Sequence, residues 1–140
     1  MPLRRAPEKR KRAVIVAVGV DLVEVERVAR LWAEGNERFL ARVFTPAERA
    51  YCLARAHPAE SLAARFAAKE AVMKCLGTGW TGGVGFGQIG VTADESGAPR
   101  VELSGEAAAK AAAAGIRRFH LSLSHTSTAA IAFVVAESDG

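Results

Sequence analysis

The sequence predicts an α+β domain, because helical and strand-like segments are both present but do not alternate regularly. Some segments place apolar residues at helical spacing, whereas others are short β-branched or alternating runs. A parallel sheet would require a strand–helix–strand order that these segments do not follow. The chain has 140 residues, half of them hydrophobic, which suits one compact domain and argues against overall disorder.

The run AVIVAVGV (residues 13–20) is short, continuous and β-branched, and it predicts a buried strand that ends at its last two residues. The following stretch, DLVEVERVARLW, changes period, because its apolar side chains recur at helical spacing (Val25, Val28 and Trp32). Asp21 is therefore expected at the junction between a strand and a helix.

Two longer helices are expected next. The sequence TPAE predicts a helix from Thr45, with an N-cap threonine, a proline at N1 and a glutamate at N3. Another helix should cover Ser61 to Leu76, with Gly77 as its C′ residue. The glycine-rich loop behind it does not match the phosphate-binding pattern GxxxxGK[ST], and it follows a helix C-terminus, where the dipole disfavours phosphate.

The C-terminal half should contain four strands and one helix. The stretches IGVTA and RVEL read as strands separated by the turn ESGAP, and the alanine-rich stretch GEAAAKAAAAG reads as a helix stopped by Gly115. The final stretch, FHLSLSHTSTAAIAFVVAE, contains two strand-like runs that meet around residues 125–128.

Most of the positive charge lies in a leader. The chain carries a formal net charge of +4, but residues 1–12 hold six basic side chains and one acid, and residues 13–140 are close to neutral. We expect residues 1–12 to be a disordered, solvated leader, although such a tail could also bind nucleic acid or anionic lipid. Residues 13–140 form the expected domain.

The sequence favours a cytoplasmic protein. Cys52 and Cys75 have no CxxC or metal-ligand spacing, so we interpret both as reduced thiols. The apolar run after the leader is only eight residues long and lacks a convincing cleavage site, which argues against a secretion signal. A membrane span would need about 20 apolar residues, and we find no such run.

The helix around residue 70 carries charge where its core face should be. On a helical wheel Lys69 falls in the apolar stripe, Glu70 lies at its edge, and Lys74 is one turn beyond Glu70. A structural account is available, since Lys69 could extend its ammonium to the surface and Glu70 with Lys74 could form an ordinary i,i+4 pair. The alternative is that this face lines a site.

Two further residues have both a structural and a functional interpretation. Asp21 could cap the following helix, or it could bind Mg²⁺ together with Glu70, because this ion prefers oxygen ligands from carboxylates, water and phosphate. His125 could be a core histidine, or it could contact phosphate beside the hydroxyls of the LSLSHTS stretch. A Ser-His-Asp hydrolase is disfavoured, because there is no GxSxG motif.

In combination, these segments resemble holo-acyl-carrier-protein synthases, the short class of 4′-phosphopantetheinyl transferases. The specific motifs are GVD and FAAKEA, supported by RFLARVFTPAE, SGAP and HLSLSHT, and the resemblance covers residues 14–137. It implies a single small domain in which helices pack on an antiparallel sheet, and which assembles as a homotrimer with coenzyme A between subunits.

The resemblance also implies a reaction and its residues. The phosphopantetheine arm of coenzyme A would pass to a serine of apo acyl carrier protein in fatty acid biosynthesis, and 3′,5′-ADP would leave. Asp21 and Glu70 are expected to bind Mg²⁺, and Lys74 is expected to face the diphosphate. Further expected contacts are to the coenzyme A phosphates (Arg65 and His125) and to the acidic carrier protein (Arg27, Arg38 and Arg42).

Some alternatives stay open at this stage. The carrier could equally be a polyketide or peptide-synthetase domain, because the sequence does not separate these clients. Glu70 is a candidate acceptor of the serine proton, directly or through a metal-bound water. A nucleic-acid-binding module would explain only the leader and would leave the GVD and AAKEA motifs unused.

Overall fold

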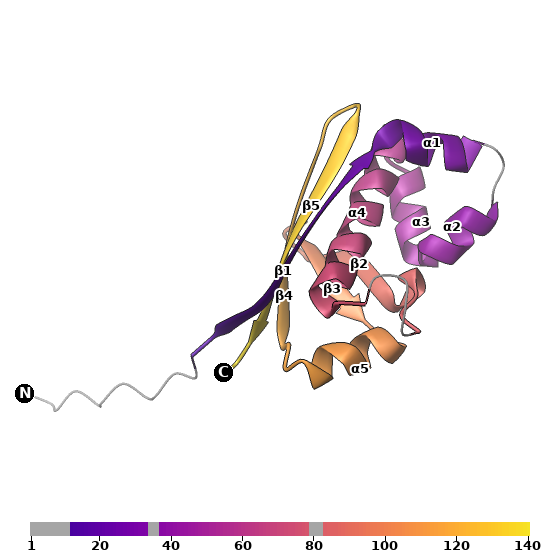
Figure 1. Cartoon of the computed structure of the whole chain (residues 1–140). Helices are drawn as coiled ribbons and strands as arrows, with labels where there is room; N and C mark the ends of the chain where they lie inside the picture. The colour runs from indigo at the N-terminus through magenta and orange to yellow at the C-terminus, as the bar shows by residue number, and fades with distance from the viewer. Residues whose placement is uncertain (1–11, 34–36, 79–82) are drawn as a thin grey trace, which may run out of the picture.

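The computed structural model describes residues 12–33, 37–78 and 83–140, which form a sheet with helices on one of its faces (Figure 1). The leader expected at residues 1–12 lies outside the described residues except for Arg12, so its predicted disorder stays a prediction. No helix of the described part is long and apolar enough to cross a membrane.

The main sheet has three antiparallel strands in the order β1-β5-β4. Strand β1 spans Val14–Glu24, β4 spans Arg118–His125, and β5 spans Ala129–Ser138. The last two strands form a hairpin, so β5 is central and bonds to β1 on one side and β4 on the other. This arrangement confirms the antiparallel sheet and the two C-terminal strands.

Helix α4, Pro58–Leu76, packs directly on this sheet and lies at the centre of the molecule (Figure 1). Its buried positions include many alanines, which permit close approach to the strands. Three shorter helices lie beyond it and one lies at the opposite end of the domain: α1 (Val25–Ala33), α2 (Glu37–Val43), α3 (Pro46–Leu53) and α5 (Gly105–Ala113).

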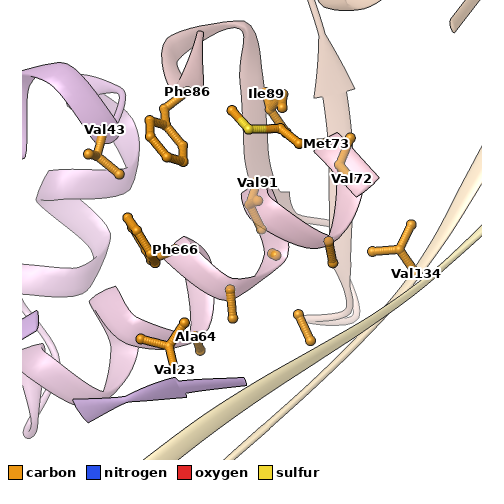
Figure 2. Close-up of a cluster of buried hydrophobic side chains, with 14 of the residues drawn as sticks. Val23, Val43, Ala64, Phe66, Val72, Met73, Phe86, Ile89, Val91 and Val134 are labelled. Atoms are coloured by element: carbon orange, nitrogen blue, oxygen red, sulfur yellow. The ribbon is translucent and has the colours of Figure 1, made fainter. Parts of the chain in front are cut away.

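A separate two-stranded sheet also contacts α4. It consists of β2 (Ile89–Ala93) and β3 (Pro99–Leu103), and the short 3₁₀ helix η1 (Phe86–Gln88) precedes it. Figure 2 shows the core that joins these parts, in which Phe66 and Met73 of α4 lie among side chains from α2, η1 and β2. The Phe66 and Phe86 rings stack with centroids 5.4 Å apart.

The sequence-based element assignment is correct in outline and wrong at several boundaries. Thr45 caps α3 in a full capping box, and Gly77 ends α4 in the left-handed conformation (φ 71°), as expected. Helix α4 begins three residues earlier than expected, at Pro58, because proline suits the first helical turn. Helix α2 was not predicted, because its seven residues give too short a periodic pattern.

The expected end of the first strand is wrong. Strand β1 continues to Glu24, so Asp21 lies within the strand and not at a junction with a helix. The reason is pairing with β5, because the residues of β1 from Ala17 to Glu24 all have partners on β5 without interruption. This pairing is a long-range interaction, and it overrides the helical periodicity that begins near Asp21.

One face of the main sheet is covered by α4, and the other face is apolar and exposed. Exposed side chains on β1 alternate with inward ones, and they continue onto β5 (Val18, Val20, Leu22, Ile131 and Phe133). Leu22 is 68% exposed and Phe133 is 45% exposed. A contiguous apolar surface of this kind usually marks an interaction site.

Candidate active site

Gly19 allows strand β1 and helix α4 to meet at backbone contact. A Cβ atom at this position would lie 2.0 Å from the carbonyl oxygen of Ala71, closer than any real contact. Because side chains alternate along a strand, Asp21 points to the same face as Gly19. The glycine of the GVD motif therefore brings the aspartate against α4.

Asp21, Glu70 and Lys74 gather at this contact and are called the site cluster below. The ammonium of Lys74 donates to the carbonyl oxygen of Val20 at 2.7 Å and to Oδ1 of Asp21 at 3.2 Å. The second carboxylate oxygen of Asp21, Oδ2, is buried and has no hydrogen-bond partner among the described residues. Such an atom is costly to bury unless something else binds it.

Glu70 is electrostatically coupled to the rest of the cluster. Burial raises the pKa of the Glu70 carboxyl, and the negative charge of Asp21 raises it further, whereas Arg27 and Lys74 lower it. A half-buried carboxylate that lies close to a second negative charge forms an environment that favours a bound cation. The sequence-based pairing of Asp21 with Glu70 is therefore consistent with the described geometry.

Lys69 lies elsewhere, in a second group that we call the core pair. Its side chain is fully buried, and its ammonium lies 2.7 Å from Oε1 of Glu48. It also donates to the carbonyl oxygens of Phe86 and Ile89, at 3.1 and 2.6 Å. The sequence-based alternative that Lys69 extends to the surface is wrong, because a buried carboxylate and two carbonyls satisfy the ammonium inside the protein.

Arg65 and His125 lie together at a cavity of about 650 Å³. The cavity is also lined by two other basic side chains, Arg55 and His57. The guanidinium of Arg65 stacks on the ring of Tyr51 at 4.1 Å, and its Nη1 donates to the hydroxyl of Ser61 at 3.3 Å. These contacts hold the arginine at the wall of a cavity whose chemistry suits an anion.

The cavity and the site cluster lie along one helix and one face of the sheet. Arg65 precedes Glu70 by five residues of α4, a distance of about 7.5 Å along the helix axis. Across the central strand, Ala132 pairs with Asp21 on one side and with Leu123 on the other. Since His125 is on the same face as Leu123, it is on the same face of the sheet as Asp21. The predicted metal-binding and phosphate-binding residues therefore form two neighbouring groups on the side of the sheet that α4 covers.

The three remaining predicted residues are exposed. Arg27 belongs to α1, and its positive charge lowers the pKa of Glu70, so it lies close to the site cluster. Arg38 and Arg42 project from α2. Their exposure leaves them accessible to a partner, and their role in carrier binding stays a prediction.

Sequence reasoning missed several residues of the site. Gly19 was quoted only as part of a motif, and its close packing became visible in three dimensions. The capping box identified Glu48 at N3 of α3, but its second role as the partner of Lys69 depends on a long-range contact. Arg55 and His57 had no sequence signal, since they lie in the irregular turn between α3 and α4, and Tyr51 of α3 had none because its contact with Arg65 forms only in the fold.

Comparison with known proteins identifies the family. The sequence model of the 4′-phosphopantetheinyl transferase superfamily matches residues 17–134. This chain belongs to that superfamily. The family predicted from the motifs is therefore confirmed.

Individual members of the superfamily are similar over almost their whole length. The holo-[acyl-carrier-protein] synthase of Koribacter versatilis is 46% identical over 124 residues, which cover 89% of this chain and 99% of the relative. The crystal structure of the synthase from Neisseria meningitidis superposes with a TM-score of 0.81 at 37% identity, covering 89% of this chain and 100% of that one. The α+β fold matches that of these transferases.

A ligand-bound member of the superfamily is also similar. The holo-(acyl-carrier-protein) synthase from Bacillus anthracis, solved in complex with CoA (3′,5′-ADP), has a TM-score of 0.73 and 34% identity. The similarity covers 89% of this chain and 97% of that structure.

Proposed function

We propose that this protein is a holo-acyl-carrier-protein synthase. It transfers the 4′-phosphopantetheine arm of coenzyme A to a serine hydroxyl of apo acyl carrier protein and releases 3′,5′-ADP. The observation that carries this proposal is the site cluster, in which the GVD and KEA motifs of the family bring two carboxylates and a lysine together. The identity to named synthases over nearly the full domain supports the same reaction.

The donor set of the cluster fits Mg²⁺. Asp21 has a buried oxygen without a hydrogen-bond partner among the described residues, and Glu70 is a half-buried carboxylate whose pKa is raised by burial and then by the charge of Asp21. Two carboxylates with substrate phosphate oxygens are the usual ligands of this ion. Asp21 and Glu70 would hold the metal, which would supply positive charge to the diphosphate of coenzyme A.

The side chains of the cluster have distinct roles in the transfer. The serine oxygen attacks the β-phosphorus of coenzyme A, and the bond between this phosphorus and the bridging oxygen breaks as 3′,5′-ADP leaves. Glu70 is the candidate acceptor of the serine proton, because it is the half-buried carboxylate beside Asp21 and Lys74. Lys74 neutralises negative charge on the transferring group, as phosphoryl-type transfer requires.

The cationic cavity beside the cluster suits the nucleotide part of coenzyme A. Arg65 and His125 carry charge or hydrogen-bond donors that match its phosphate groups. Three exposed arginines near the same end of the domain give an acidic carrier protein a complementary surface (Arg27, Arg38 and Arg42). We propose a cytoplasmic location, in keeping with the free thiols of Cys52 and Cys75.

The exposed apolar face of the main sheet supports a homotrimer. Residues such as Leu22 and Phe133 would cost free energy in water, and association of three copies would bury them. Coenzyme A sites would then lie at the boundaries between subunits. Light scattering coupled to size exclusion measures the mass, and a monomer at all concentrations would contradict the trimer.

The reaction is tested by incubating the protein with coenzyme A, Mg²⁺ and apo acyl carrier protein, with intact mass as the readout. A mass gain of one phosphopantetheine arm on the carrier supports the proposal. The same reaction with polyketide and peptide-synthetase carrier domains identifies the preferred client. If none of these carriers gains mass, the proposed function is wrong.

A further inference from the structure

Glu60 lies between the two histidines of the cationic cavity. It belongs to the first turn of α4 and its side chain is 15% exposed. Its Oε1 lies 3.4 Å from Nδ1 of His125, and its Oε2 lies 3.6 Å from Nδ1 of His57. One carboxylate therefore contacts the same ring nitrogen of two imidazoles that come from different parts of the chain.

The cavity itself presents the opposite charge. Four basic side chains line it (Arg55, His57, Arg65 and His125), and no carboxylate is among its described lining residues. Glu60 is thus placed behind the histidines, where it contacts their Nδ1 atoms without lining the cavity. An acid at the wall would repel an anionic ligand, whereas an acid behind the imidazoles leaves the lining of the cavity free of negative charge.

The geometry points to Glu60 as a positioning residue that orients His125 for an anionic phosphate ligand. A carboxylate at Nδ1 fixes the proton on that nitrogen, which leaves Nε2, on the other side of the ring, to face the ligand. The same arrangement orients histidines in many metal sites, where a carboxylate behind the ring sets its tautomer. The inference rests on the proposed function, because it assigns the cavity to the phosphates of the nucleotide product and substrate.

A simpler role for Glu60 would be a favourable contact with the helix dipole, since it lies in the first turn of α4. That role requires no histidine. Glu106 occupies the first turn of α5, away from the cavity, and therefore serves as a matched control.

The first test compares steady-state kinetics of the Glu60→Ala, Glu60→Gln and Glu106→Ala variants. We expect Glu60→Ala to raise KM for coenzyme A about tenfold while kcat stays within about twofold. Glu60→Gln should be intermediate, because its amide oxygen can still accept a hydrogen bond from the Nδ1–H group. Glu106→Ala should match the wild type. Equal KM for the wild type and Glu60→Ala would overturn the inference.

The second test needs no turnover. Nitrogen-15 NMR of the histidine rings at a pH where they are neutral should place the proton of His125 on Nδ1 in the wild type and on Nε2 in Glu60→Ala. Calorimetric titration with 3′,5′-ADP should give weaker binding for Glu60→Ala, by about the same factor as the KM change. An unchanged tautomer or unchanged affinity would overturn the positioning role.

The two tests separate this inference from the proposed function. If the wild type transfers phosphopantetheine but Glu60→Ala behaves like it, only the role of Glu60 is wrong. If the wild type neither transfers the arm nor binds 3′,5′-ADP, the proposed function fails first. Circular dichroism melting of each variant identifies any loss of fold, and the NMR of Glu60→Gln then supplies the decisive measurement.

Discussion

Two carboxylate–lysine groups lie on different flanks of helix α4, and they are built in opposite ways. In the core pair, Glu48 accepts hydrogen bonds from the amides of Thr45 and Val91 as well as contacting Lys69. In the site cluster, Asp21 keeps a buried oxygen that has no hydrogen-bond partner in the described part of the chain, and the Lys74 side chain is 55% exposed. The core pair is complete without any ligand, whereas the site cluster is not.

This difference separates a stabilising ion pair from a functional one. A buried pair is tolerated when hydrogen bonds satisfy all its atoms, and its disruption leaves an uncompensated charge. A group with an unsatisfied atom and mutually repelling carboxylates lowers stability and is typical of sites that bind something. Lys69 and Glu70 are adjacent in the sequence, yet they belong to these two different groups.

The largest effect is expected in the site cluster. Replacing Glu70 with glutamine should lower kcat by about 10²–10⁴-fold, because the variant can neither accept the serine proton nor neutralise a metal ion. Carrier modification followed by mass spectrometry measures the rate, and thermal unfolding should report a folded protein. Normal turnover in this variant would remove Glu70 from the mechanism.

Disruption of the core pair should act on stability. The Lys69→Met variant leaves Glu48 buried without its cation, and we expect a loss of about 3–5 kcal/mol in the free energy of unfolding. Urea denaturation measures this loss. The double variant Glu48→Gln/Lys69→Met should recover at least about 1 kcal/mol, and strictly additive losses would argue against direct coupling.

The corresponding change in the site cluster should leave stability almost unchanged. Asparagine at position 21 keeps an oxygen that accepts from Lys74, so the free energy of unfolding should change by less than about 1 kcal/mol. Activity should fall, because one proposed metal ligand is lost. A destabilisation as large as that of Lys69→Met would mean that the two groups do not differ as described.

The stability contribution of Glu70 should depend on pH. Because its pKa is raised in the folded protein, the folded state binds this proton more tightly than the unfolded chain does. The resulting stability is present below the ordinary pKa of glutamate, about 4.3, and is lost as the pH rises through the raised value. With a chelator present, Glu70→Gln should therefore gain stability relative to the wild type as the pH increases, as measured by urea midpoints. If the stability difference between Glu70→Gln and the wild type stayed constant across this pH range, the pKa of Glu70 would not be raised in the folded protein.

Charges outside both groups should have the smallest effect. Arg38→Glu on α2 should weaken carrier binding a few-fold, mainly through the association rate, and the effect should shrink at high salt. Lys110→Glu makes the same charge change on α5, at the other end of the domain (Figure 1). Equal losses for the two variants would indicate a nonspecific charge effect instead of a docking surface.

The sequence predicted the fold where local signals are strong. The TPAE capping box and Gly77 at the end of α4 depend on adjacent residues, and both were located correctly. The continuation of β1 through Asp21 and the partner of Lys69 depend on residues far away in the chain. No local pattern carries that information, so the strand end was wrongly predicted, and the alternatives left open for Lys69 did not include its buried pairing with Glu48.

The site was predicted in a similarly uneven way. The family motifs identified Asp21, Glu70 and Lys74, and the structure brings them together. Glu60 was not identified, because its partners His57 and His125 come from a turn and from a strand 65 residues further along the chain. Long-range electrostatic pairs of this kind require the folded arrangement.

The close approach at Gly19 has a consequence for metal selectivity. The spacing between the two proposed metal-binding carboxylates depends on how closely β1 approaches α4. This close approach requires that residue 19 has no Cβ atom. An alanine at position 19 would push the strand away from the carbonyl of Ala71. The distance between the carboxylates of Asp21 and Glu70 would then increase, although neither residue is changed. Since Ca²⁺ accepts longer bonds than Mg²⁺, such a spacer substitution would shift ion preference toward the larger cation.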